Sequence, residues 1–143
     1  MAKHEVPVSV TNNTGSVITE VQYMHRYDSD VYNTGNLPVL ADNATQVIGI
    51  ATFWTGFLRT GYDYWWIQFV RDGKKYTCKA NFYCYLTSDD KSATLKLTKD
   101  TMTVVPSSSS SCEVRIYQSD QLEALLTQEY DAEDKKREAA AAQ

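Results

Sequence analysis

The chain has 143 residues, of which 43% are hydrophobic and 12% aromatic, and its 14 basic and 18 acidic residues give a net charge of −4. A chain of this length forms one domain that buries roughly two thirds of its surface. Its apolar content excludes a disordered protein. The lack of a basic excess argues against a nucleic-acid partner, because binding to phosphates requires clustered Lys and Arg.

The beginning of the chain and its cysteines bear on its compartment. Met1–His4 leads directly into an alternating segment, without the apolar stretch of about 7–15 residues that a secretory signal contains. We therefore expect a protein that is cytoplasmic or secreted by a route not visible in the sequence. Cys78, Cys84 and Cys112 allow at most one disulfide. Which pair would be bridged is left open, and the missing signal favours reduced thiols that pack as small hydrophobic groups.

Alternation of apolar and polar residues, typical of half-buried strands, extends over most of the chain. It begins at residues 6–10, where Pro7 indicates an edge strand or a strand end. A second strand is expected over 17–27, and residues 28–43 indicate a loop or a short edge strand. Residues 45–54 are apolar on both faces, as expected of a central strand.

A hairpin is expected at Asp72-Gly73, a dipeptide that favours two-residue turns. This turn would fix the register of residues 64–71 against 74–80. The pairs on the core face would be Phe69–Tyr76, Ile67–Cys78 and Trp65–Ala80, and those on the outer face Val70–Lys75, Gln68–Thr77 and Trp66–Lys79. A slip by one residue would exchange the two faces on both strands, so the pattern supports this register.

The remaining strands are short, at 82–86, 95–97, 102–105 and, after a serine-rich run, 112–117. Seven or eight short strands separated by turns are typical of a sandwich. We therefore predict a mainly β protein whose residues 1–117 form an antiparallel β-sandwich.

Residues 118–143 have a helical pattern. Asp120 and Glu123 have the spacing of a capping box. A narrow apolar stripe follows at helical spacing, formed by Leu122, Leu125, Leu126 and Tyr130. The rest of the segment is charged and rich in alanine, which favours a helix with no face to bury. We expect a C-terminal α-helix that either packs on the sandwich or forms contacts in a homo-oligomer.

The sequence contains no set of residues typical of an enzyme. His25 lies on the apolar side of a strand, where a structural histidine is more common than a catalytic one. The cysteines lack the spacing of a zinc site, and no glycine-rich loop precedes a helix. Asp89 and Asp90 are a weak candidate for a calcium site, because a solvated turn explains the pair better. We predict a non-enzymatic protein without cofactors.

Aromatic residues are dense between Phe53 and Tyr85. Most must be core, but by strand parity several point outward. Outward rings on rigid strands bind sugars, quaternary ammonium groups and membrane interfaces, although they can also be ordinary surface contacts. The candidate ligand-binding residues are Trp54, Tyr62, Tyr64, Trp66 and Tyr83.

Four stretches resemble the "up-regulated in Daf" domain family: residues 55–66, 72–78 and 81–90, and the serine-rich run ending in Cys112. The resemblance covers roughly residues 5–115 and implies one β-sandwich domain. It implies no settled molecular activity.

A fainter resemblance, at residues 12–15 and 62–69, is to the sandwiches of actinoporin cytolysins and fungal fruit-body lectins. It implies that aromatic residues near the hairpin engage glycans or phosphocholine head groups. Actinoporins carry an amphipathic helix ahead of the sandwich, and this sequence departs from that pattern. We therefore expect a binding module for a glycan or a phospholipid head group. The alternatives are a self-assembling protein that uses the C-terminal helix and a pore-forming protein.

Overall fold

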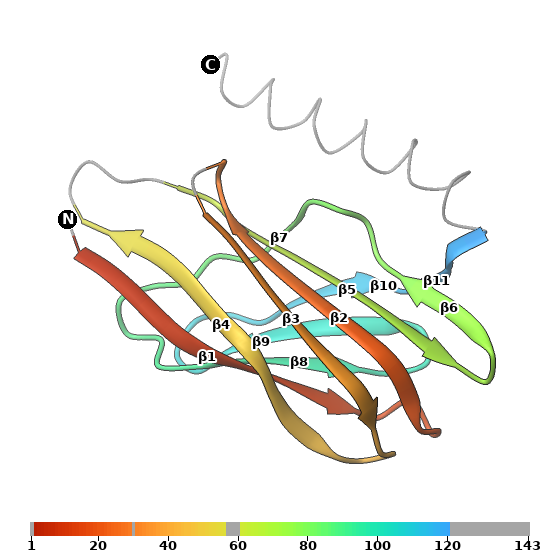
Figure 1. The fold of residues 1–143 in the computed structure, drawn as a ribbon. Helices are drawn as coiled ribbons and strands as arrows, with labels where there is room; N and C mark the ends of the chain where they lie inside the picture. The colour runs from red at the N-terminus through yellow and green to blue at the C-terminus, as the bar shows by residue number, and fades with distance from the viewer. Residues whose placement is uncertain (1, 30, 57–60, 121–143) are drawn as a thin grey trace.

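The computed structural model describes residues 2–29, 31–56 and 61–120, and Figure 1 shows them as two packed β-sheets. The strands are β1 (Ala2–Asn12), β2 (Ile18–Tyr27), β3 (Val31–Leu40), β4 (Thr45–Thr55), β5 (Asp63–Arg71), β6 (Lys74–Thr77), β7 (Phe82–Tyr83), β8 (Ala93–Leu97), β9 (Thr101–Pro106), β10 (Cys112–Arg115) and β11 (Tyr117–Gln118).

One sheet, here called the β1 sheet, has the order β10-β9-β8-β1-β4. The other, the β5 sheet, has the order β11-β6-β5-β2-β3, and β7 also pairs with β5. Neighbouring strands are antiparallel except β1 and β8, which run parallel. The predicted mainly β architecture of two antiparallel-rich sheets is confirmed.

The expected C-terminal helix falls almost entirely on residues 121–143. These lie outside the described residues, as does the apolar stripe Leu122, Leu125, Leu126 and Tyr130. Within the described ranges, no helix has the length and apolar character needed to cross a membrane.

The core lies between the two sheets and follows the alternation of the sequence. On β1, Val8 and Val10 are fully buried, while Ser9 between them is partly exposed on the opposite face. On β5, Trp65, Ile67 and Phe69 are likewise fully buried. Side chains at alternate positions of a strand share one face, so each strand contributes its apolar parity to the core.

The hairpin at Asp72-Gly73 forms as predicted, with positive φ angles of 52° and 76° at the two turn residues. The predicted pairs Phe69–Tyr76, Val70–Lys75 and Gln68–Thr77 are confirmed.

The expected register fails beyond Thr77, where β6 ends. Trp65 pairs with Phe82 of β7 rather than with Ala80. A four-residue detour, residues 78–81, separates the two strands, and Ala80 is exposed within it. The detour places a phenylalanine rather than an alanine opposite Trp65, which fills more of the core.

The expectations for residues 28–54 are partly wrong. A full edge strand, β3, occupies much of the stretch that indicated a loop or a short edge strand, and β4 lies at the edge of the β1 sheet rather than at its centre. The backbones of β3 and β4 approach so closely that a Cβ at Gly35 would lie 1.9 Å from the carbonyl oxygen of Ile48. The second apolar face of β4 is not covered by this approach, because Val47 and Ile50 are 60% and 45% exposed.

Two cysteines form a disulfide, contrary to the expectation of reduced thiols. Cys84, which follows β7, is bonded to Cys112 of β10 in the opposite sheet. The remaining thiol, Cys78, is buried, and burial raises its pKa to about 12. Only Cys78 therefore packs as the small hydrophobic group expected of all three.

Candidate functional site

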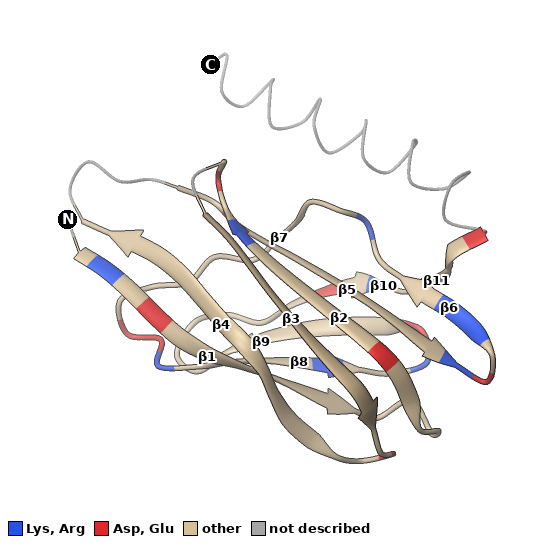
Figure 2. Cartoon of the chain, viewed as in Figure 1, with Lys and Arg blue, Asp and Glu red and all other residues tan. Residues whose placement is uncertain are grey.

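A cleft of about 430 Å³ lies where the end of β4 meets β7 and the segment that follows it. Its described lining consists of Trp54, Thr55, Gly56, Gly61, Tyr62, Tyr83, Tyr85, Leu86, Thr87 and Ser88. Aromatic rings and hydroxyl groups dominate this set, and none of these ten residues carries a charge. Figure 2 shows charged residues gathered on β6 and its turn, while β7 carries none.

The cleft brings together three of the five candidates from the sequence: Trp54, Tyr62 and Tyr83. Tyr64 adjoins it, with its ring centre 6.2 Å from that of Tyr83 and 6.4 Å from that of Tyr62. Trp66 does not line the cleft. It lies two positions further along β5, half-buried against the core.

Sequence reasoning missed Tyr85 and the hydroxyl residues of the cleft, Thr55, Thr87 and Ser88. Tyr85 is 43% exposed and stacks with Tyr83 at a centroid distance of 6.5 Å. Because it has the same parity as Tyr83, the outward alternation of residues 82–86 was a signal that could have identified it. No comparable pattern distinguishes the threonines and the serine from those of ordinary turns.

One wall of the cleft consists of three tyrosines, Tyr62, Tyr83 and Tyr85. The rings of Tyr62 and Tyr83 meet edge to face, with centroids 5.2 Å apart, in the geometry that aromatic pairs favour. The pKa of Tyr83 is raised above its ordinary value, mainly by burial and to a smaller extent by the neighbouring Tyr62 and Asp63. Its hydroxyl is therefore protonated at neutral pH and can donate a hydrogen bond to a ligand.

Tyr27, a buried residue of β2, holds the part of the cleft formed by Trp54 and Gly61. Its hydroxyl donates to the carbonyl oxygen of Trp54 at 3.2 Å and accepts the N–H of Gly61 at 3.0 Å. Its ring also packs on Trp54, with centroids 5.3 Å apart. A Cβ at residue 61 would lie 2.1 Å from the Tyr27 ring, so only glycine fits there. One buried side chain thus positions the end of β4 and the start of the chain leading into β5.

The buried carboxylate of Asp63 anchors the wall that follows β7. One of its oxygens accepts the N–H of Leu86 at 2.9 Å, and the other lies 2.7 Å from Nε2 of His25. The main-chain oxygen of Asp63 accepts the N–H of Cys84 at 3.1 Å. His25 is fully buried, and it supports the cleft through Asp63.

Asp90 anchors the far end of the same wall. It is 1% exposed, and its two oxygens accept hydrogen bonds from the main-chain N–H groups of Thr87, Ser108 and Ser109 and from the Ser109 hydroxyl. Burial alone would raise the pKa of Asp90, but these hydrogen bonds lower it below its ordinary value.

The lone pairs of Asp90 are thus occupied by donors, and Asp89 is exposed. Within the described ranges, no group of three or more His, Cys, Asp or Glu side chains could hold a metal. Asp90 thus ties the serine-rich loop to the turn at Thr87.

The family model described as "Up-Regulated in long-lived daf-2" matches residues 2–138, and the chain therefore belongs to this family. The resemblance seen in the sequence is thus confirmed over almost the whole chain. No curated protein matches the sequence.

Proposed function

We propose that this protein is a non-enzymatic binding module that takes a sugar ring or a choline-type lipid head group into the aromatic cleft. The observation that carries the proposal is the convergence of Trp54, Tyr62, Tyr83 and Tyr85 with the hydroxyls of Thr87 and Ser88 around one hollow whose described lining is uncharged. The walls are held by buried hydrogen bonds of Tyr27, Asp63 and Asp90. A preformed site loses little entropy when it binds a ligand.

The chemistry of the lining favours a sugar over a lipid head group. Tyrosine and tryptophan rings present flat apolar faces with polar edges, which match the C–H face and the hydroxyl rim of a pyranose. A quaternary ammonium group would also bind to the rings through cation–π contacts. However, the lining also carries three hydroxyls, those of Thr55, Thr87 and Ser88, which a trimethylammonium group cannot use. The Thr55 hydroxyl is bonded to His4 and the Thr87 hydroxyl donates to Asp90, so these two would serve a sugar chiefly as acceptors.

A glycan array and sedimentation with choline-lipid vesicles, followed by calorimetric titration of any hit, test the proposal. Binding should weaken about tenfold in Tyr62→Ala, because truncation of an exposed aromatic anchor commonly costs more than about 1 kcal/mol. The matched control is Ile50→Ala, which removes a side chain of similar exposure from β4 and should leave affinity unchanged. Absence of binding to sugars and vesicles alike at about 100 µM, the weak end of single-site affinity, would refute the proposal.

A further inference from the structure

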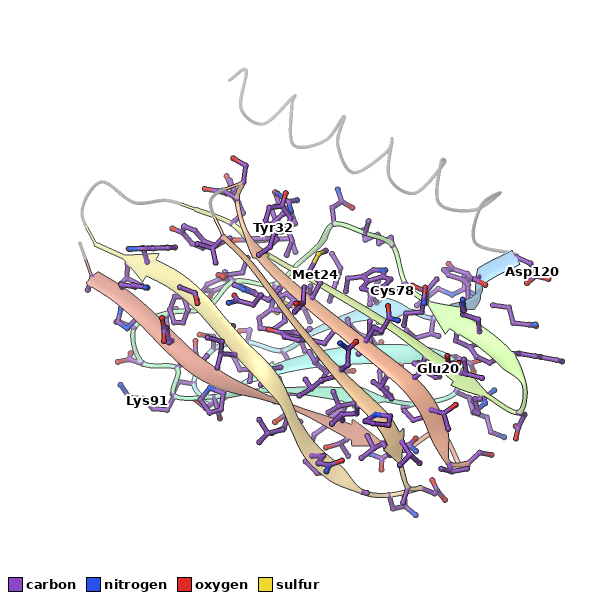
Figure 3. All side chains as sticks on the ribbon, viewed as in Figure 1. Glu20, Met24, Tyr32, Cys78, Lys91 and Asp120 are labelled. Carbon is purple, nitrogen blue, oxygen red and sulfur yellow. A yellow bond between two sulfur atoms is a disulfide. The ribbon has the colours of Figure 1, made fainter. Side chains whose placement is uncertain are left out.

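A row of side chains extends from the cleft across the outer face of the β5 sheet. The register places Tyr83 of β7 opposite Tyr64 of β5, Tyr64 opposite Arg26 of β2, and Arg26 opposite Tyr32 of β3. Residues directly opposite one another on adjacent strands project to the same face. Figure 3 labels Tyr32, the last member of the row, which is 61% exposed.

Arg26 is the cation of this row. Its guanidinium lies 4.2 Å from the centre of the Tyr64 ring, and its Nη1 donates to the main-chain oxygen of Asp28. Among the described residues, no carboxylate forms an ion pair with Arg26. The carboxylate of Asp28 accepts the N–H of Tyr62 at 2.8 Å. Since an arginine has five N–H donors, the ring and the carbonyl leave others available for an anion.

A second described cation near the cleft, Lys3, is already paired. Lys3 lies opposite Trp54 on the neighbouring strand, but its Nζ is 3.3 Å from the carboxylate of Glu5. The described lining of the cleft is itself uncharged. Among the described residues, Arg26 is therefore the cation left to interact with a charged ligand near the cleft, and a single ring, Tyr64, separates it from the cleft tyrosines.

On the basis of the proposed function, we infer that the ligand is an acidic oligosaccharide. One sugar ring occupies the cleft, and a carboxylate or sulfate on an adjoining unit binds the guanidinium of Arg26. The planar guanidinium matches either anion with two parallel hydrogen bonds. Its position over Tyr64 pre-orients it, and the adjoining sugar unit lies along the tyrosine row toward Arg26. Arg26 is then the residue that determines specificity for charge.

The experiment uses an array of oligosaccharides in matched neutral, uronic-acid and sulfated forms, with calorimetric titration of the best matched pair. The full chain should bind the acidic forms about tenfold more tightly than the neutral ones, as expected for a charge-assisted hydrogen-bond pair. Arg26→Gln should abolish this preference and change affinity for the neutral form less than about twofold. Arg26→Lys should retain only part of the preference, because lysine keeps the charge without the planar fork.

Arg115→Gln is the matched control, because the Arg115 guanidinium also lies over a tyrosine, 5.2 Å from the ring centre of Tyr117, on strands that do not line the cleft. Its preference should equal that of the unmodified protein. Equal binding of neutral and acidic forms, or a preference that survives Arg26→Gln, would overturn the role of Arg26 while leaving the cleft as a sugar site. Absence of binding to every sugar would instead refute the proposed function as well.

Discussion

His25 and Asp63 form a buried hydrogen-bonded pair, with side chains 0% and 2% exposed. Nδ1 of His25 lies 2.9 Å from the amide oxygen of Asn33, which also accepts the N–H of Thr52. Nε2 lies 2.7 Å from the carboxylate of Asp63. Both ring nitrogens of the buried His25 therefore have a polar partner, and Asp63 depends on His25 for one of its own.

Replacement of His25 by alanine should destabilise the protein by about 3–5 kcal/mol, because it leaves the carboxylate of Asp63 buried without its partner. Urea unfolding followed by circular dichroism measures the loss. His4→Ala is the control, since the ring of His4 is only part-buried and bonds to a threonine hydroxyl. A loss below about 1 kcal/mol, the scale of an ordinary net hydrogen bond, would show that Asp63 does not depend on His25.

Asp90 should make the stability of the domain depend on acid. Because its pKa in the folded state is below the ordinary value, Asp90 contributes stability above the ordinary carboxyl pKa of about 3.9. That contribution is lost as the pH falls through the lower, folded-state pKa. Asp90→Asn should therefore be destabilised at pH 7 by about 1–3 kcal/mol.

The difference in unfolding free energy between Asp90→Asn and the unmodified protein should shrink as the pH is lowered toward 3. Asp89→Asn, at the exposed neighbouring position, serves as the control and should show no such trend. A difference that stays constant with pH would contradict the role of Asp90 as an ionised acceptor.

At the residue scale, strand parity predicted which aromatic rings leave the core but not which of them meet. Trp66 and Tyr64 share the outer parity of β5, yet only Tyr64 contacts the cleft tyrosines. The reason is distance along the strand, because Trp66 lies beyond the last pair between β5 and β7. Parity predicts the face of the sheet on which a side chain lies. Whether that side chain belongs to a site also depends on which other segments of the chain lie beside it.

At the scale of elements, local turn chemistry predicted more than strand composition did. The Asp72-Gly73 turn fixed its hairpin, but Pro7 indicated an edge strand or a strand end, and β1 lies inside its sheet. Pairing with β8 begins only at Val8, so Pro7 has a neighbouring strand on one side alone, where it lies opposite Ile50 of β4. Pro7 thus correctly indicated a position with an unpaired side, but it did not reveal that most of β1 lies between two other strands.

The contact between β3 and β4 gives a prediction at this scale. Gly35→Ala should destabilise the protein by about 1–3 kcal/mol, the usual cost of an overpacked site, because the new Cβ would overlap the carbonyl oxygen of Ile48. Thr34→Ala, at the adjacent exposed position of β3, is the control and should change stability by less than about 0.5 kcal/mol. Thermal unfolding compares the two. Equal stability of both variants would mean that the sheet edges can separate at little cost.

At the scale of the whole molecule, the two sheets are joined covalently and by a strand that changes sheets. Residues 112–117, expected to form one strand, divide into β10 in the β1 sheet and β11 in the β5 sheet. The disulfide between Cys84 and Cys112 joins the same regions. Neither feature could be predicted from the spacing of residues along the chain, because both depend on how the two sheets stack in space. The disulfide also ties the tyrosine wall of the cleft to the opposite sheet.

Loss of this disulfide should lower the unfolding free energy by about 3.5 kcal/mol, because the bond restricts the unfolded chain over a sequence separation of 28 residues. Urea titrations of the unmodified protein and of Cys112→Ser, each with and without dithiothreitol, measure the effect. Reductant should destabilise the unmodified protein to the level of the variant and leave the variant unchanged. A reductant effect of the same size in Cys112→Ser would assign the loss to something other than the disulfide. Indifference of the unmodified protein to reductant would show that its cysteines are not bridged in solution.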